Sequence, residues 1–239
     1  MIRRIAAGIA TIVLVLSTAG SVSATADVTN AQMREQGVTI NLTNIPWMLS
    51  DDPVETPDGT YYFMSIKAAV GEASGHNISG TSMDETGVSY HQWAVSNDVW
   101  TFLPGWSGSV PNTAGLVMTR SLSGATLKTS NIPVGYCNSY ETEDAGGGCT
   151  DYVNVGTVDL DLTVTPTSKL MTGVNTDTWG VPGVMQYTSR LTGTYRDVSV
   201  SGDVKLPGLD AASYSSPLGS IYRMAIGSMD LWVTHGPQH

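Results

Sequence analysis

The feature that most limits the fold of this chain is a strict two-residue alternation of apolar and polar side chains. Between residues 157 and 165 every second side chain is aliphatic, and the side chains between them are Asp or Thr. The same pattern recurs between residues 197 and 206. Such alternation is typical of an antiparallel strand with one face buried and the other in water. The two apolar faces consist of Val158, Leu160, Leu162, Val164 and of Val198, Val200, Val204, Leu206.

Shorter alternating segments and Pro- or Gly-containing turns continue the pattern along the chain. From their spacing we expect about ten strands in one antiparallel domain, either a β-sandwich or a flattened β-barrel. The apolar phase changes at Gly227-Ser228, which predicts a β-bulge with Gly227 at or beside it. A similar change of phase near Arg196 predicts a second irregularity.

The N-terminal segment has the pattern of an export signal. Arg3 and Arg4 precede an uncharged, largely apolar run from Ile5 to Leu16, which is too short for a stable membrane span. The small residues that end at Ala26 predict cleavage between Ala26 and Asp27. We therefore expect a Sec-type signal peptide over residues 1–26, a single all-β domain over residues 27–239, secretion, and no stable membrane anchor.

The charge balance and the two cysteines fit an exported protein. The formal net charge is −10, and the diffuse acidic balance argues against nucleic acid and anionic membranes as partners. Cys137 and Cys149 enclose a polar, glycine-rich loop, and in an oxidising compartment such a pair forms a disulfide. With neither further thiols nor a nearby histidine, we interpret the pair as structural.

A search for catalytic and metal-binding patterns finds none. The segment Gly105-Trp106-Ser107-Gly108-Ser109 does not match the Gly-x-Ser-x-Gly nucleophile elbow. The four histidines lack zinc-ligand spacing, and the acidic clusters lack the spacing of an EF-hand. We therefore expect no metal and no cofactor. His91 alone lies within the predicted body of the fold.

The aromatic composition carries the functional hypothesis. The chain has 6 Trp and 10 Tyr against 2 Phe, and Trp and Tyr suit surfaces that are partly wet. Trp47, Trp106 and Trp179 lie next to Pro or Gly in apparent loops, so we expect exposed rings that bind a ligand. The competing interpretation is that most of these rings close the ends of one large β core.

Three functions remain open from the sequence. The leading hypothesis is a secreted, non-enzymatic protein of unknown partner that binds carbohydrate or another cell-envelope component. The first alternative is a β-barrel that carries a small apolar ligand, which requires inward-facing residues too small to fill the interior. The second alternative is a secreted hydrolase, which requires His91 to meet a carboxylate or a serine in a cleft.

Overall fold

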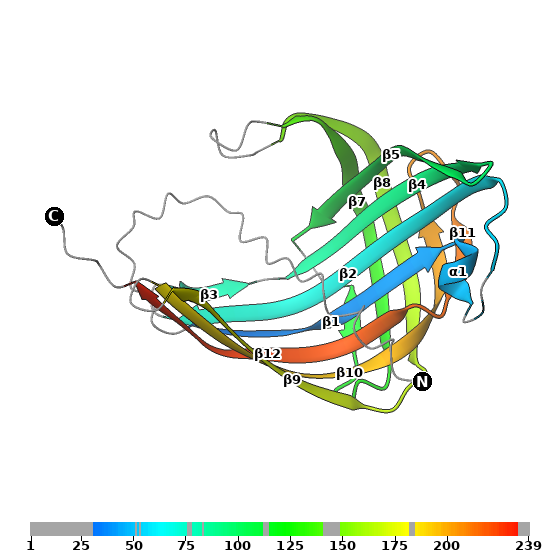
Figure 1. The fold of residues 1–239 in the computed structure, drawn as a ribbon. Helices are drawn as coiled ribbons and strands as arrows, with labels where there is room; N and C mark the ends of the chain where they lie inside the picture. The colour runs from blue at the N-terminus through cyan, green and yellow to red at the C-terminus, as the bar shows by residue number, and fades with distance from the viewer. Residues whose placement is uncertain are drawn as a thin grey trace.

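The structure is a computed structural model that describes residues 31–50, 52, 54–75, 78–82, 84–111, 115–140, 149–181 and 185–233. Within these ranges nearly all regular structure is β-strand, and all the strand pairs are antiparallel. The strands belong to one sheet that curls until its first and last parts meet (Figure 1). The all-β antiparallel prediction is therefore confirmed, and of the two architectures expected, the structure is close to a barrel.

Eight strands form a closed ring. In spatial order they are β1 (Ala31–Thr43), β12 (Gly219–Val233), β10 (Met185–Lys205), β8 (Cys149–Pro166), β7 (Ala125–Tyr140), β5 (Val99–Val110), β4 (Glu85–Ser96) and β2 (Gly59–Gly75). Pairing of β2 with β1 closes the ring. Beside it lie β3 (Ile78–Ser82), β6 (Leu116–Met118), β9 (Met171–Val181), β11 (Ala212–Ser216) and the short helix α1 (Pro46–Leu49). The described residues thus contain twelve strands rather than about ten.

The seam between β5 and β7 is the thinnest part of the ring. A single residue pair, Ser107 with Gly135, joins these two strands. Glycine permits the close approach here, because a Cβ on Gly108 would lie 1.9 Å from the Pro133 carbonyl oxygen. A side chain at position 108 would therefore require the two backbones to move apart.

The apolar side chains of the predicted alternation fill the interior of the ring. The aliphatic faces of the strands at 157–165 and 197–204 point inward and meet those of β1, β2 and β7 in one core. Asp161, which alternation places outside, lies opposite Lys128 and forms an ion pair of 2.7 Å with it. Fully buried members of the core are Val38, Ile40, Ile66, Leu127, Ile132, Val134, Val158, Val198 and Ile221.

The two predicted irregularities have different outcomes. Between β10 and β12 the register shifts, with Thr188 opposite Asp230 and Arg190 opposite Gly227. One more residue lies on β12 than on β10 in this interval, which confirms the bulge beside Gly227. The second prediction is wrong, because the register runs without interruption from Arg190 to Asp197. Arg196 simply lies on the inner face, opposite the buried Ile221.

An ionic cluster lies on the outer face of β1. The Glu35 carboxylate is almost fully buried, accepts a hydrogen bond of 2.6 Å from the Tyr222 hydroxyl, and forms an ion pair of 3.2 Å with Lys67. Gly37 and Ala69 are also buried between these strands. Because both residues are small, the long side chains of Lys67 and Tyr222 can lie across them and reach Glu35.

Several expectations fall outside the described residues. The signal peptide and its cleavage point between Ala26 and Asp27 belong to residues 1–30. The backbone of β7 and β8 pairs Tyr140 with Cys149, but the side chain of Cys149 is not described, so the disulfide to Cys137 stays a prediction. Among the described helices, none has the length and apolar character needed to cross a membrane.

The Glu35 cluster predicts how stability changes at alkaline pH. Burial, and then the Glu35 carboxylate, raise the pKa of Tyr222 far above its ordinary value. The folded pKa exceeds the unfolded one, so this stabilisation is present below about pH 10 and is lost as pH rises further. We expect Tyr222→Phe to cost about 1 kcal/mol at neutral pH and to make the alkaline fall in unfolding free energy shallower.

Urea unfolding from neutral pH to about pH 11.5 measures both effects, since that range passes the ordinary tyrosine pKa. Tyr152→Phe is the matched control because Tyr152 is an exposed tyrosine on β8. An alkaline slope as steep in Tyr222→Phe as in the wild type would contradict the prediction.

Candidate functional site

A hollow on the outer surface of the ring is lined entirely by apolar side chains. It has a volume of about 480 Å³ and lies at the end of the ring where β1 finishes. We call it the tryptophan groove and define it by Ile45, Trp47, Met48, Phe63, Trp93 and Trp100. Three of the six tryptophans in the chain therefore converge on one place.

Strand register brings these residues together. Tyr61 lies opposite Trp93 across β2 and β4, and Trp93 lies opposite Phe102 across β4 and β5. On β2 and β4 the odd-numbered residues face outward, because their even-numbered neighbours Tyr62 and Tyr90 pack on the core. On β5 the register places Phe102 and Trp100 on this outward face, opposite Trp93 and Val95. The result is an aromatic outer face with ring-centroid distances of 5.7 Å for Tyr61–Trp100, 6.4 Å for Trp93–Trp100 and 6.0 Å for Trp93–Phe102.

The segment after β1 covers one side of this aromatic face. Ile45 is buried and packs with Tyr61 and Val95, and Pro46 starts the single turn of α1 that carries Trp47. Proline suits a first helical position because it has no N–H to leave unpaired there. Trp47 keeps 53% of its surface exposed and Trp100 keeps 40%, so both rings border the groove and face water.

Hydrogen bonds hold the rim of the groove in place. The Asn44 side chain bridges to β2, donating to the Thr60 carbonyl and accepting from the Tyr62 N–H. The Asp58 carboxylate accepts from the Asn97 N–H, which ties the β4–β5 turn to the loop before β2. A groove built this way is preorganised, so ordering its side chains costs a ligand little free energy.

Of the three predicted binding tryptophans, Trp47 and Trp106 do not share a site. Trp47 lies in the tryptophan groove. Trp106 differs from the expectation of an exposed loop residue: it lies in β5 and is packed on the core, where its ring stacks on Tyr90 at 4.8 Å. Trp179 lies opposite Tyr187 in the pairing of β9 with β10, and its side chain is outside the described part. Sequence context did not single out Trp93 and Trp100, which lie on different strands and come together only through the register of β4 and β5.

The inner aromatic residues close this end of the barrel. Tyr90 stacks between Trp106 and Tyr62, with centroid distances of 4.8 and 5.9 Å, and Tyr62 meets the edge of Tyr214. Burial raises the pKa of both Tyr62 and Tyr90 above the ordinary tyrosine value. The interior that the apolar-ligand alternative needs is filled here by large side chains.

His91 lies on the outer aromatic face. Its ring is 6.2 Å from Trp93 and 6.1 Å from Phe102, measured between centroids. In the described part of the chain, no hydrogen bond joins His91 to a serine or a carboxylate, and no group of three or more His, Cys, Asp or Glu has the arrangement of a metal site. The described contacts of His91 are therefore aromatic ones.

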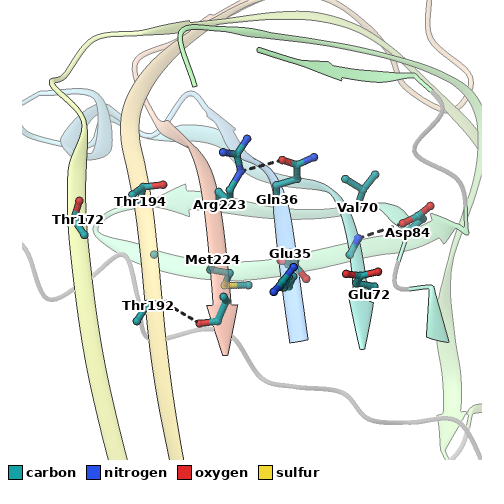
Figure 2. A pocket seen from close by; sticks show the side chains of 14 residues that line it. Glu35, Gln36, Val70, Glu72, Asp84, Thr172, Thr192, Thr194, Arg223 and Met224 are labelled. Carbon is teal, nitrogen blue, oxygen red and sulfur yellow. Dashed lines mark hydrogen bonds between the residues drawn. The ribbon is translucent and has the colours of Figure 1, made fainter. Parts of the chain in front are cut away.

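A second hollow, of about 720 Å³, opens on the inner face of the ring at the opposite end, where β1 begins (Figure 2). Beyond the buried row that contains Val38 and Ile221, toward this end of the ring, two further rows of inward-facing residues run across the strands. One row runs Val70, Gln36, Arg223, Thr194, Thr172, and the next runs Glu72, Arg34, Ala225, Thr192. We call this hollow the arginine mouth.

Sequence reasoning missed the arginine mouth although a signal was present. Arg34 and Gln36 continue, in phase, the inward positions of Val38, Ile40 and Leu42. Polar residues in phase with a buried face indicate that the inner surface meets water farther along the same strand. The apparent change of phase at Arg196 has the same origin, because on β10 a charged residue also occupies an inward-facing position.

The different surroundings of the tryptophans predict different stabilities for their alanine variants. Trp106→Ala removes a ring packed on the core and is expected to lower the unfolding free energy by about 3 kcal/mol. Trp100→Ala removes a ring at the surface and is expected to cost about 1 kcal/mol. Guanidinium unfolding followed by far-UV circular dichroism measures both, and equal losses would contradict the assigned environments.

Comparisons with known proteins add little to this geometry. No protein-family model matches the chain, and no curated protein matches it. Among solved structures, an acetoacetate decarboxylase-like enzyme from Sphingomonas wittichii RW1 is similar over 88% of this chain and 95% of its own length. The identity is 11% and the TM-score is 0.24, a likeness too distant to carry an argument about function.

Proposed function

We propose that this protein is a secreted, non-enzymatic binding protein that receives a carbohydrate of the cell envelope in the tryptophan groove. The observation that carries the proposal is the convergence of Trp47, Trp93 and Trp100 on one hollow with a fixed rim. Exposed aromatic surface of this extent needs a partner, because contiguous apolar patches are rare on soluble proteins without one. Phe102, whose ring lies against Trp93, extends the patch with 59% of its surface exposed.

Flat aromatic rings at the surface suit sugar binding. A pyranose ring presents a face of C–H groups, which packs against an indole ring and keeps its hydroxyls in water. Large aromatic rings also contribute contact area with few torsions to immobilise. Trp47 and Trp100 come from different segments, so one saccharide chain can contact both.

The apolar lining of the groove supports a second candidate ligand, a small apolar molecule. No polar side chain is among the residues that line the groove, and a sugar site ordinarily adds several hydrogen-bonding groups to its aromatic platform. An alkyl chain or another apolar group satisfies such a lining without hydrogen bonds. The groove on the outer surface, and not the barrel interior, is then the place for the small apolar ligand considered from the sequence.

Secretion and the disulfide belong to the same proposal. The signal-like segment over residues 1–26 and the pair Cys137 and Cys149 both fit an oxidising, extracellular compartment. A hydrolase built around His91 remains a prediction from the sequence. The contacts of His91 support an aromatic role at the edge of the groove better than an acid–base role.

Isothermal titration calorimetry tests the groove with defined probes: chitohexaose, xylohexaose, laminarihexaose and palmitate. We expect one of the glycans to bind, and Trp47→Ala and Trp100→Ala each to weaken that binding at least about tenfold. Tyr152→Ala, an exposed aromatic residue on β8 outside the groove, is the matched control and leaves affinity unchanged.

The outcomes separate the two candidates. Binding of palmitate alone, with the same loss in both tryptophan variants, selects the apolar ligand and overturns the carbohydrate proposal. The groove proposal itself fails if no probe binds, or if the tryptophan variants bind as tightly as the wild type.

The cysteine pair predicts a redox-dependent stability. Reduction of the mature protein is expected to lower its unfolding free energy by about 3 kcal/mol, because the link closes a short loop in the unfolded chain. Thiol titration in denaturant before and after reduction, together with urea unfolding, measures this. Two reactive thiols in the protein purified without reductant would contradict the predicted bond.

A further inference from the structure

We propose that the arginine mouth is a second binding site, which takes an acidic sugar such as a uronic acid residue. It lies on the inner face at the opposite end of the ring from the tryptophan groove, so the inference does not depend on the proposed function. The acid group of the ligand binds to the arginines, and its hydroxylated body lies along the threonines of β9 and β10.

Arg34 and Arg223 line the mouth of this acidic protein, alongside acidic residues. The chain has 11 basic against 21 acidic residues, yet Arg34, Arg196 and Arg223 share one inner surface on the neighbouring strands β1, β10 and β12. Charges grouped on a concave wall attract an anion more strongly than the same charges spread over a surface.

Among the described residues, these arginines have no ionic partner. The ion pairs in this part of the chain are Lys67–Glu35 and Lys128–Asp161, and neither uses an arginine. Arg223 donates from Nε to the Gln36 side-chain oxygen at 3.2 Å, which leaves its terminal N–H groups for a ligand (Figure 2). The buried Nε of Arg196 has no hydrogen-bond partner among the described residues. Arg196 lies opposite Ile221, one row deeper than the residues that line the hollow, so its charge can attract an anion without touching it.

Three acidic residues are among those that line the hollow: Glu35, which Lys67 and Tyr222 already engage, and Glu72 and Asp84, which set where the acid group lies. Glu72 is opposite Arg34, and Asp84 accepts a hydrogen bond of 3.2 Å from the Gly71 N–H. Glu72 and Asp84 are on the β2 side of the mouth, whereas Arg223 is on β12 (Figure 2). Repulsion from the carboxylates therefore directs the acid group toward Arg223, and Glu72 is left to accept hydrogen bonds from ligand hydroxyls.

The remaining lining favours a hydroxylated ligand over a fatty acid. Thr172, Thr192 and Thr194 supply hydroxyls, and Gln36 supplies an amide. The Thr192 hydroxyl is only partly used, in a bond of 3.2 Å to the Ala225 carbonyl. A fatty acid would leave these groups facing alkyl chain, whereas sugar hydroxyls pair with them. The volume of about 720 Å³ accommodates more than one sugar ring.

Isothermal titration calorimetry of the mature protein at low ionic strength tests the site with three probes: trigalacturonate, neutral maltotriose and inorganic phosphate. We expect trigalacturonate to bind and maltotriose not to bind. Arg223→Gln and Arg34→Gln are expected to weaken trigalacturonate at least about tenfold, and added salt is expected to weaken it in the wild type. Arg120→Gln, an exposed arginine outside the mouth, is the matched control.

Circular dichroism establishes that each variant is folded before it is titrated. Trp100→Ala should retain trigalacturonate binding, which separates the mouth from the tryptophan groove. The proposal is overturned if trigalacturonate does not bind, or if Arg223→Gln and Arg34→Gln bind it as tightly as Arg120→Gln does. Phosphate or maltotriose binding as tightly as trigalacturonate would also overturn it, in favour of a plain anion or neutral sugar site.

Discussion

Pairing between β1 and β2 is the interaction on which the rest of this structure depends. It extends from Ala31 opposite Gly75 to Thr43 opposite Phe63, and it turns an open sheet into a ring. Without it, β1 would end the sheet with a row of unpaired N–H and C=O groups. Closure also gives each strand an enclosed inner face and an outer face, so that the same two-residue alternation supplies a core and a surface.

The two candidate sites lie where the strands do not follow the usual rule of apolar side chains inside the ring and polar side chains outside it. On β2, β4 and β5, aromatic residues occupy the outer face as well as the inner one, and α1 covers them only in part. On β1, β10 and β12, polar and charged residues occupy the inner face beyond Val38 and Ile221. An apolar surface outside and a charged surface inside are both costly unless something binds there.

The inward side chains differ between the two ends of the barrel. Tyr62, Tyr90, Trp106 and Tyr214 fill the interior near the tryptophan groove with stacked and edge-on rings. At the mouth, the inward positions carry charged and polar side chains such as Arg34, Gln36 and Arg223 together with the short Thr192, Thr194 and Ala225. The inward side chains thus change along the barrel axis from packed aromatic rings to polar and charged groups.

The amino-acid sequence by itself determined the strand class, the antiparallel arrangement, most of the inward aliphatic residues, and the bulge beside Gly227. These depend on local periodicity, which each strand carries in its own residues. Only the tertiary structure decided that the sheet closes, that Trp47 meets Trp93 and Trp100, and that Arg34, Arg196 and Arg223 share one wall. Those contacts depend on register between segments far apart in the chain. Alternation states that two residues share a face, but the closed ring decides whether that face meets a core, a groove or water.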